Sequence, residues 1–388
     1  MPRRLLVILF IIVFLDLVGF GIVIPLLPLY AERYQPPPWA FGLLLSSFSL
    51  MQFFFAPVLG GLSDRWGRRP VLLISLTGSA VGYLLFGLAD SLAMLFASRI
   101  IAGVAGANIA TAQAVIADVT SPEERTRGMG LIGAAFGLGF VAGPAIAGLL
   151  LPFSPRLPGF AAAAFSAFAG AAVFFALPET RKAGQVRGSR WQMVGSRKLR
   201  LLLVVGFLVV TGWAGFEVTF AQFLHARLLL APSQVAWLFA YVGVLVVLVQ
   251  GVFVRRLPAF WTPRTLLIPG LVFSVVALVL VAETAAVAQL LMVLPVLALG
   301  QGLVNPALSA WISRQVSAEF QGQALGAFQA TNSLARIVGP FVGEMAFGHL
   351  GPTAPPMVAA ALAAVAVLLV LSPRGQLPFR RLLRNGHR

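Results

Sequence analysis

The chain has 388 residues, of which 59% are hydrophobic and only 10% charged, whereas a soluble globular protein carries about 25% charged residues. So few charged side chains could not cover the surface of a soluble particle of this size, and the high hydrophobicity excludes a disordered chain. The mean hydropathy of +0.93 therefore indicates a membrane protein that crosses the bilayer several times as helices.

The net charge is +16, and the chain has no cysteine and only two lysines, Lys182 and Lys198. The absence of cysteine excludes disulfides and thiolate metal sites. Neither lysine follows a glycine, which excludes a Walker A loop for ATP hydrolysis. We expect no cofactor, no metal and no enzymatic activity, so that a gradient or a partner drives any work the protein does.

Twelve apolar stretches follow one another along the chain, each near the ~20 residues that a helix needs to cross a bilayer. They lie at about 5–30, 39–62, 71–89, 92–117, 128–151, 159–177, 199–224, 233–254, 265–282, 286–312, 323–347 and 355–372. The longest polar segment, residues 178–198, divides them into two sets of six. We therefore expect an all-α membrane protein with 12 transmembrane helices. Residues 1–177 and 199–388 would form two pseudo-symmetric six-helix bundles, joined by a cytoplasmic linker (178–198) and followed by a short basic tail.

Basic residues gather in alternate loops, and the positive-inside rule translates this bias into an orientation. One side receives most of them, including those of the linker and the C-terminal tail, while the other side receives only Arg33, Arg156 and Arg227. Both termini are therefore expected in the cytoplasm. The positive charge is interpreted as a topology signal and not as a nucleic-acid surface.

The two halves contain a repeat. Glu123 and the Gly143-Pro144 pair recur as Glu319 and the Gly339-Pro340 pair, at the constant offset 319 − 123 = 339 − 143 = 196. Two similar halves predict a transporter whose site lies between them. Since proline disrupts a helix and glycine allows close approach, the Gly-Pro pairs are expected to break their spans and to form a rocking interface between the halves. The alternative is that both residue types are simply frequent in membrane helices.

The second span ends in a dense run of glycine, aspartate and arginine that contains Gly60, Asp64, Arg65, Gly67, Arg68 and Arg69. Gly60 allows close helix contact, Gly67 allows a tight turn, and Asp64 suits the N-terminus of a neighbouring helix, where the dipole favours an anion. The alternative is an ordinary basic loop. The run resembles motif A of the major facilitator superfamily, G-x-L-x-D-R-x-G-R-R, at every signature position.

Other segments narrow the resemblance to twelve-span drug:proton antiporters of the tetracycline-efflux type. Residues 16–28 resemble the first-span motif of that family, and residues 99–106 resemble its motif B, in which Arg99 matches an arginine that the family links to proton transfer. A segment of span five resembles antiporter motif C through Gly139, Gly143, Pro144 and Gly148. The resemblance implies the superfamily fold, alternating access between the halves, and a gating role for motif A.

Five ionisable residues fall within the predicted spans: Asp16, Arg99, Glu217, Arg336 and Glu344. A charge at that depth costs about 2.5–3.5 kcal/mol on insertion scales, so each needs a partner or a role. Asp16 and Glu217 are predicted to face each other across a central cavity as proton carriers, coupled to Arg99. The alternatives are local packing for Asp16 and a structural link between spans for Arg99.

Arg336 and Glu344 lie eight residues apart on span eleven, and we interpret them as a structural ion pair on one helix face. An apolar, aromatic cavity with carboxylates would suit a lipophilic cation through ion pairing and cation–π contacts. Its candidate side chains are Phe20, Asn108, Gln113, Trp213, Phe216, Phe220, Gln301 and Asn305. The alternative for many of the phenylalanines is that they face lipid.

These features predict proton-coupled efflux of small amphipathic or lipophilic compounds, multidrug or tetracycline-like, by alternating access and driven by the proton gradient. The expected partners are a small-molecule substrate, protons and the lipid bilayer, without nucleic acid. We expect a monomer in a bacterial cytoplasmic membrane. The alternative is a proton-independent facilitator or importer of a sugar or metabolite, which the scarcity of polar residues on the expected cavity-lining spans disfavours.

Overall fold

The computed structural model describes residues 2–120, 122–180, 197–249, 262–316 and 321–372, and these residues form long helices joined by short loops. They contain no strand, which confirms the prediction of an all-α protein. Residues 181–196 of the predicted linker and 373–388 of the predicted tail lie outside the described residues.

The helices of the first half come before the linker, and those of the second half follow it. The first half contains α1 (Pro2–Val23), α2 (Leu26–Ala31), the 3₁₀ turn η1 (Glu32–Tyr34), α3 (Pro38–Trp66), α4 (Arg68–Leu88), α5 (Leu92–Ala105), the 3₁₀ turn η2 (Gly106–Asn108), α6 (Ile109–Val119), α7 (Pro122–Leu150) and α8 (Leu157–Ala176). The second half contains α9 (Arg197–Leu228), α10 (Pro232–Leu248), α11 (Pro263–Glu283), α12 (Val287–Ser313), α13 (Gln321–Leu350) and α14 (Ala354–Leu371). Each predicted stretch overlaps one of these helices or up to three elements in direct succession, and residues 250–254 of the stretch 233–254 lie outside the described residues.

The lengths and compositions of these helices fit a bilayer. Among the described residues, nine helical stretches are long and apolar enough to cross a membrane. Two shorter apolar stretches, Gly137–Leu150 and Pro232–Leu248, belong to α7 and α10. The remaining long helix, α13, has 30 residues and carries more polar side chains. The protein is therefore a multi-pass membrane protein, as the composition predicted.

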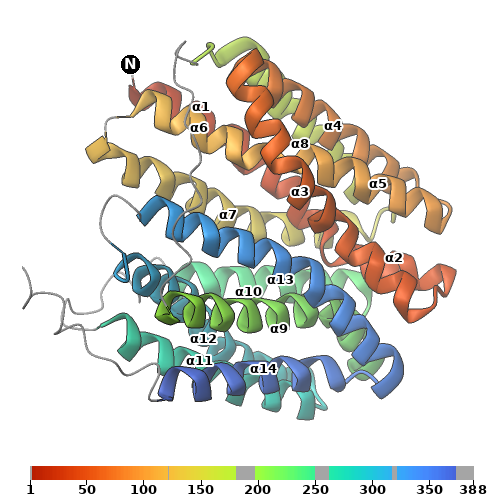
Figure 1. The fold of residues 1–388 in the computed structure, drawn as a ribbon. Helices are drawn as coiled ribbons and strands as arrows, with labels where there is room; N and C mark the ends of the chain where they lie inside the picture. The colour runs from red at the N-terminus through yellow and green to blue at the C-terminus, as the bar shows by residue number, and fades with distance from the viewer. Residues whose placement is uncertain (1, 121, 181–196, 250–261, 317–320, 373–388) are drawn as a thin grey trace, which may run out of the picture.

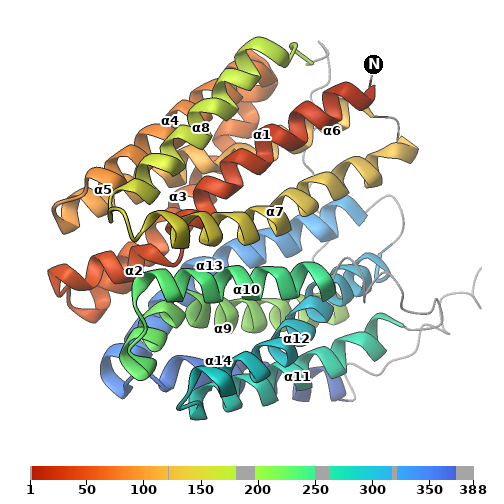
Figure 2. The same ribbon diagram turned by 180° about the vertical axis from the view of Figure 1, so that it is seen from behind.

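The helices gather in two bundles that follow the division of the sequence. Figures 1 and 2 show α1 to α8, in red to yellow-green, beside α9 to α14, in green to blue. Within the first bundle, α1 packs on α7 and α8, and α4 packs on α5 and α8. Within the second, α9 packs on α13 and α14, and α11 packs on α12 and α14. The two bundles meet where α3 contacts α13 and where α7 contacts α10.

Glycines produce an equivalent close helix crossing in each bundle. In the first, Gly21 of α1 lies against Gly139 and Gly143 of α7, and a Cβ on Gly143 would be 2.6 Å from the carbonyl carbon of Gly21. In the second, Gly215 of α9 lies against Gly339 and Gly343 of α13, and a Cβ on Gly343 would be 2.5 Å from the Gly215 carbonyl oxygen. Only glycine permits backbones this close.

These contacts correct two expectations from the sequence repeat. The glycines in equivalent contacts are separated by 339 − 139 = 343 − 143 = 200 residues, which is one helical turn more than the predicted offset. The Gly-Pro pairs also do not break their helices, because α7 and α13 both continue through their prolines. The paired glycines hold helices together inside each bundle. The helices that carry them, α7 and α13, also contact α10 and α3 of the opposite bundle, and Pro340 lines the cavity between the bundles, so a rocking interface along these spans stays a prediction.

The bundles touch along one half of α3. A Cβ on Gly348 would lie 2.5 Å from the Pro38 ring, and one on Gly42 would lie 3.0 Å from the Phe341 Cα. Further along, the Ser46 hydroxyl donates a hydrogen bond of 2.8 Å to the Ile337 carbonyl.

The opposite ends of α3 and α13 are less crowded. Gly60 and Gly61 of α3 and Gly326 of α13 have no neighbouring atom within 4 Å of an added Cβ. α3 and α13 therefore pack closely at the end where α3 begins and α13 ends, and less closely at the end of α3 that carries motif A.

Candidate functional site

A cavity of about 80 Å³ lies between the two bundles, where α1, α3 and α5 face α9 and α13. Its uncharged wall consists of Phe20, Val23, Ile24, Leu27, Leu45, Phe48, Ser49, Ala214, Val218 and Pro340. A drug-sized ligand needs a site of about 300–1,000 Å³, so the cavity must widen before it can hold one.

Three charged side chains complete this wall: Arg99 from α5, Glu217 from α9 and Arg336 from α13. The sequence identified Arg99 and Glu217 as central, but it placed Arg336 in a structural ion pair outside the cavity. The first bundle supplies one guanidinium, and the second supplies a carboxylate and a second guanidinium. The cavity therefore holds one positive charge more than negative when all three groups are ionised.

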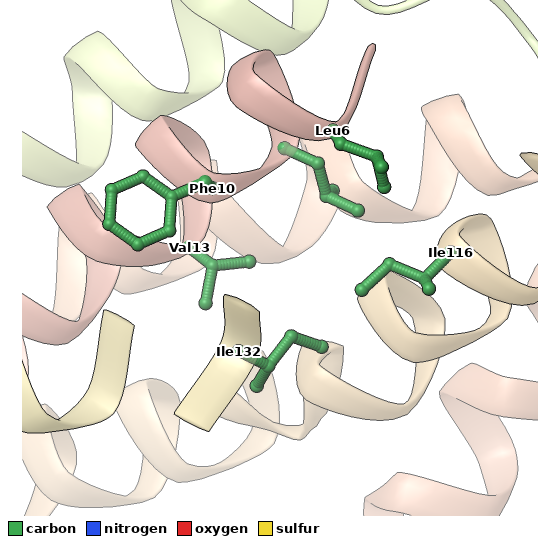
Figure 3. A pocket seen from close by; sticks show the side chains of 6 residues that line it. Leu6, Phe10, Val13, Ile116 and Ile132 are labelled. Carbon is green, nitrogen blue, oxygen red and sulfur yellow. The ribbon is translucent and has the colours of Figure 1, made fainter. Parts of the chain in front are cut away.

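A second pocket lies between α1, α6 and α7 (Figure 3). The side chains that line it are Leu6, Leu9, Phe10, Val13, Ile116 and Ile132. All six are apolar, so they offer nothing to hold a proton or a polar ligand. The charged cavity between the bundles is therefore the candidate site.

Arg99 is 2% exposed and is surrounded mainly by aromatic rings. Its guanidinium carbon lies 6.0, 5.8 and 5.6 Å from the ring centres of Phe48, Tyr83 and Phe86, and one nitrogen donates a hydrogen bond of 3.3 Å to the Ser98 hydroxyl. The ion pairs of the described residues include none for Arg99, and its Nε has no hydrogen-bond partner. Ring faces stabilise a guanidinium only partly, so Arg99 is suited to bind an anionic group that enters the cavity.

Glu217 and Arg336 come from the two helices that cross at Gly215. Glu217 follows that glycine by two residues, and Arg336 precedes the crossing residue Gly339 by three, so the crossing brings both to the cavity. The Arg336 charge acts on the Glu217 carboxylate, but the two are not among the ion pairs of the described residues, which have N–O distances within 4.0 Å. Glu217 therefore remains available to a proton or to a cation.

Asp16 does not line the cavity, so the prediction that it faces Glu217 is wrong for this conformation. Its carboxylate accepts hydrogen bonds of 3.2 Å from the Asn108 amide and 3.2 Å from the Ser166 hydroxyl, inside the first bundle. Asn108 is presented by η2, which interrupts the span between α5 and α6. The structure thus supports the local packing role that was the alternative for Asp16.

The predicted aromatic and polar contacts divide into three groups. Phe20 lines the cavity. Phe216, Phe220 and the partly buried Trp213 instead pack in an apolar cluster that the second bundle forms together with Leu29 of α2. Asn108 binds Asp16, the Gln301 amide lies 3.5 Å from the Ser274 hydroxyl, and Gln113 and Asn305 are exposed.

The predicted ion pair between Arg336 and Glu344 is absent from the ion pairs of the described residues. Eight residues of α-helix rise about 12 Å, so the two side chains start far apart along the helix and lie in different surroundings. Glu344 is instead 3% exposed and accepts a 3.4 Å hydrogen bond from the Gln222 amide of α9.

Motif A forms a charged cluster at the end of the first bundle. Arg68 contacts the Asp64 carboxylate at 2.6 Å and the Asp118 carboxylate of α6 at 3.1 Å, and it also donates a 2.6 Å hydrogen bond to the Ser63 hydroxyl. Arg68 therefore links three helical segments of one bundle: the end of α3, the start of α4 and the end of α6.

A residue outside the motif occupies the helix N-terminus that was predicted for Asp64. Asp64 is 59% exposed and faces Arg68. The Glu179 carboxylate, just after α8, accepts hydrogen bonds of 2.8 and 3.1 Å from the backbone N–H groups of Arg68 and Arg69 at the start of α4. Glu179 was not predicted as part of this cluster, and its signal in the sequence is an acid shortly after an apolar span.

The glycines of motifs A and C have distinct roles. Gly67 has a φ of 106° and turns the chain between α3 and α4, as predicted, whereas Gly60 lacks the expected close helix contact. In motif C, Gly139 and Gly143 pack α7 on α1 within the first bundle. Gly148 packs against the Trp237 ring of α10, 3.0 Å from an added Cβ, and so lies between the bundles.

Comparison with known proteins identifies relatives along nearly the whole chain. The family model described as Major Facilitator Superfamily matches residues 9–262 and 202–382. A tetracycline resistance protein of class D from Salmonella ordonez is 35% identical over 355 residues, which cover 88% of this chain and 89% of that protein. Multidrug resistance protein 1 of Bacillus subtilis (strain 168) is 28% identical and covers 86% and 87%. The crystal structure of the human organic anion transporter MFSD10 (TETRAN) superposes with a TM-score of 0.73 at 26% identity, over 95% of this chain and 99% of that one.

Proposed function

The chain belongs to the major facilitator superfamily, and from that premise we propose that it exports small amphipathic compounds in exchange for protons by alternating access. The observation that carries the proposal is the charged cavity between the bundles, with Glu217 and two arginines in one apolar wall. The relatives that confer resistance to tetracycline and to several drugs support export as the direction of transport.

The charges of the cavity support a narrower substrate class than the sequence did. The lipophilic cation suggested by the sequence would meet two guanidinium groups and one carboxylate, so the cavity would repel it when all three are ionised. The ring faces of Phe48 and Tyr83, which could bind a cation, already contact Arg99. A purely anionic compound would favour the protonated form of Glu217, because like charges oppose each other, so proton and substrate would bind together. That outcome is cotransport and not exchange.

A compound with both an acidic group and a basic nitrogen would avoid the repulsion expected for a cation and the cotransport expected for an anion. Its acidic group would bind Arg99, and its cationic nitrogen would compete with the proton for Glu217. Tetracyclines, which carry an ionisable enol system and an amine, have this chemistry. We therefore propose zwitterionic amphipathic compounds as the substrate class and Glu217 as the carrier of the exchanged proton.

The test uses purified protein in liposomes with a pH-sensitive dye inside. Tetracycline should move protons across the bilayer with the wild-type protein, and Glu217→Gln should abolish this movement. Asp16→Asn is the matched control, because it also neutralises a carboxylate within the membrane but outside the cavity, and it should retain coupling. Normal coupling in Glu217→Gln would overturn the assignment.

The same assay distinguishes the alternative function and the substrate class. Uptake that ignores the pH gradient would favour a facilitator of sugars or metabolites. Lipophilic dyes that carry only a positive or only a negative charge should be exchanged more slowly than tetracycline, and equal rates would contradict the zwitterion proposal.

The orientation and the oligomeric state belong to the same proposal. We place both termini on the cytoplasmic side of a bacterial inner membrane, because the basic loops favour it. A monomer is sufficient, since one chain supplies every residue of the cavity wall.

A further inference from the structure

Gln222 of α9 and Glu344 of α13 form a buried polar pair in the second bundle, outside the charged cavity. Their side chains are 2% and 3% exposed. The Gln222 Nε2 donates a hydrogen bond of 3.4 Å to Glu344 Oε1. The pair lies directly beneath the contact with α3, since a Cβ on Gly42 would be 3.4 Å from the Glu344 Cβ.

Each member of this pair has one oxygen without a hydrogen-bond partner. Gln222 Oε1 and Glu344 Oε2 are both buried and both unpaired. Two acceptors cannot bind each other, and leaving a buried polar atom unpaired costs about 1–3 kcal/mol, with more for a charged group. The Gln222 amide already faces the Glu344 carboxyl through its Nε2, so a hydrogen on Glu344 Oε2 is what the pair lacks for a second hydrogen bond, and the only ionisable group of the pair is the Glu344 carboxyl.

We propose that Glu344 binds a proton in this conformation and donates it to Gln222 Oε1. The acid and the amide then form a cyclic pair with two hydrogen bonds, in which Gln222 Nε2 donates to Glu344 Oε1 and Glu344 Oε2 donates to Gln222 Oε1. This is a proton site separate from Glu217, one helical turn beyond the cavity residue Pro340 on α13.

The charged groups around Glu344 come from η1 and α9. Glu32, the first residue of η1, acts on Glu344 as a second negative charge, while His225 of α9 and Gln222 act on Glu32. The facing part of α3, with Gly42 and its neighbours, has no titratable side chain, and α14 has none along its length. Burial raises the pKa of Glu32, and the His225 charge and the Gln222 amide oppose this rise.

The proton has a consequence for the contact between the bundles, and this step rests on the proposed alternating access. Loss of the proton would leave a buried negative charge beneath α3, near Glu32 of the other bundle. Two carboxylates on opposite sides of one contact repel each other. Release of the proton would therefore favour separation of α3 from α13, and binding would favour the closed contact.

The protonation itself is tested by infrared difference spectroscopy between high and low pH on the purified protein in lipid nanodiscs. A band of a protonated carboxyl should be present at neutral pH and disappear in Glu344→Gln. That variant can keep both hydrogen bonds of the pair and should therefore fold. Gln222→Leu, which removes the acceptor, should shift the band to higher frequency. A neutral-pH spectrum that Glu344→Gln leaves unchanged would overturn the proposal.

The effect on the contact is tested with a single reporter thiol, since the chain has no cysteine. Ser46 is 3% exposed at the contact, so Ser46→Cys should react with a water-soluble thiol reagent only when α3 and α13 separate. Ionisation of the thiol also raises the reaction rate with pH, but it does so equally in the wild-type and Glu344→Gln backgrounds. The ratio of the rate in the wild-type background to the rate in the Glu344→Gln background therefore removes this effect. This ratio should rise several-fold with pH, and a constant ratio would refute the gating step.

The two tests are separable from the proposed function. Glu217→Gln should keep both the infrared band and the rise of the labelling ratio, because Glu217 lies in the cavity and not in the Gln222–Glu344 pair. Loss of the band in Glu217→Gln would assign it to Glu217 and overturn the Glu344 site. Failed proton exchange in liposomes with a retained Glu344 band would refute the proposed transport alone.

Discussion

Replacing Gly143 by alanine tests whether the helix crossings set the rigidity of each bundle. The added Cβ would lie 2.6 Å from the carbonyl carbon of Gly21, 2.7 Å from its Cα and 2.7 Å from the nitrogen of Ile22. All three atoms are backbone, so relief requires α1 and α7 to move apart. Overpacking of this kind costs about 1–3 kcal/mol, against about 1 kcal/mol gained from the better helix propensity of alanine.

Gly61→Ala is the matched control, because Gly61 is also inside a helix and has no atom within 4 Å of an added Cβ. Both variants gain the same helix propensity, so the difference between them isolates the contact and should be about 1–3 kcal/mol. Unfolding of membrane proteins is commonly irreversible, so apparent midpoints are compared at one heating rate in one detergent. Gly143→Ala should melt below wild type, and Gly61→Ala at or above it. If Gly143→Ala melts as high as Gly61→Ala, the bundles tolerate separation and the argument fails.

Two further predictions concern charges outside the cavity. Arg68→Ala leaves the Asp118 carboxylate, 16% exposed, without its ion-pair partner, and should lower the free energy of unfolding by about 1–2 kcal/mol. The apparent midpoint of thermal unfolding, compared with wild type at one heating rate, should fall as a result, and an unchanged midpoint would show that the cluster contributes nothing to stability. Glu32→Gln tests pH dependence. Because burial raises the pKa of Glu32, its contribution to stability is present below the ordinary pKa of glutamate and is lost as the pH rises through the raised value. The variant should therefore match wild type in acid and be more stable at neutral pH, and parallel pH profiles of unfolding would contradict this.

The sequence predicted the architecture because a bilayer permits few kinds of membrane-spanning structure. Each apolar stretch of sufficient length must satisfy its backbone as a helix, and the polar segment after residue 177 separates the two sets. Finer features depended on contacts between distant helices. The sequence repeat indicated an offset of 196 residues, whereas the glycines of α7 and α13 make equivalent contacts at an offset of 200 residues. The spacing of residues along the chain does not show which face of a helix contacts its neighbour.

The site was predicted in part. Arg99 and Glu217 were identified because a charge within an apolar span is costly, and both line the cavity. The same rule cannot tell which partner relieves the cost. Asp16 is satisfied by Asn108 and Ser166 within its own bundle, while Arg336 turned out to face the cavity. Choosing between these outcomes requires the rotation of each helix about its axis, which spacing along one chain does not determine.

The two glycine crossings differ at one residue, and this difference distinguishes a position needed for packing from a position with a functional task. In both bundles, two glycines four residues apart receive a partner glycine, and this arrangement serves packing in each. The residue after the second glycine differs: it is Pro144 in α7 and Glu344 in α13. In two copies of one scaffold, the residues that both copies need for close contact stay the same. A position that is apolar in one copy and carries a buried carboxyl in the other therefore has a different task in each copy. Glu344 meets this criterion independently of the unpaired oxygens at its hydrogen bond with Gln222. If its only task were packing, an apolar residue would do so without the cost of burying an acid.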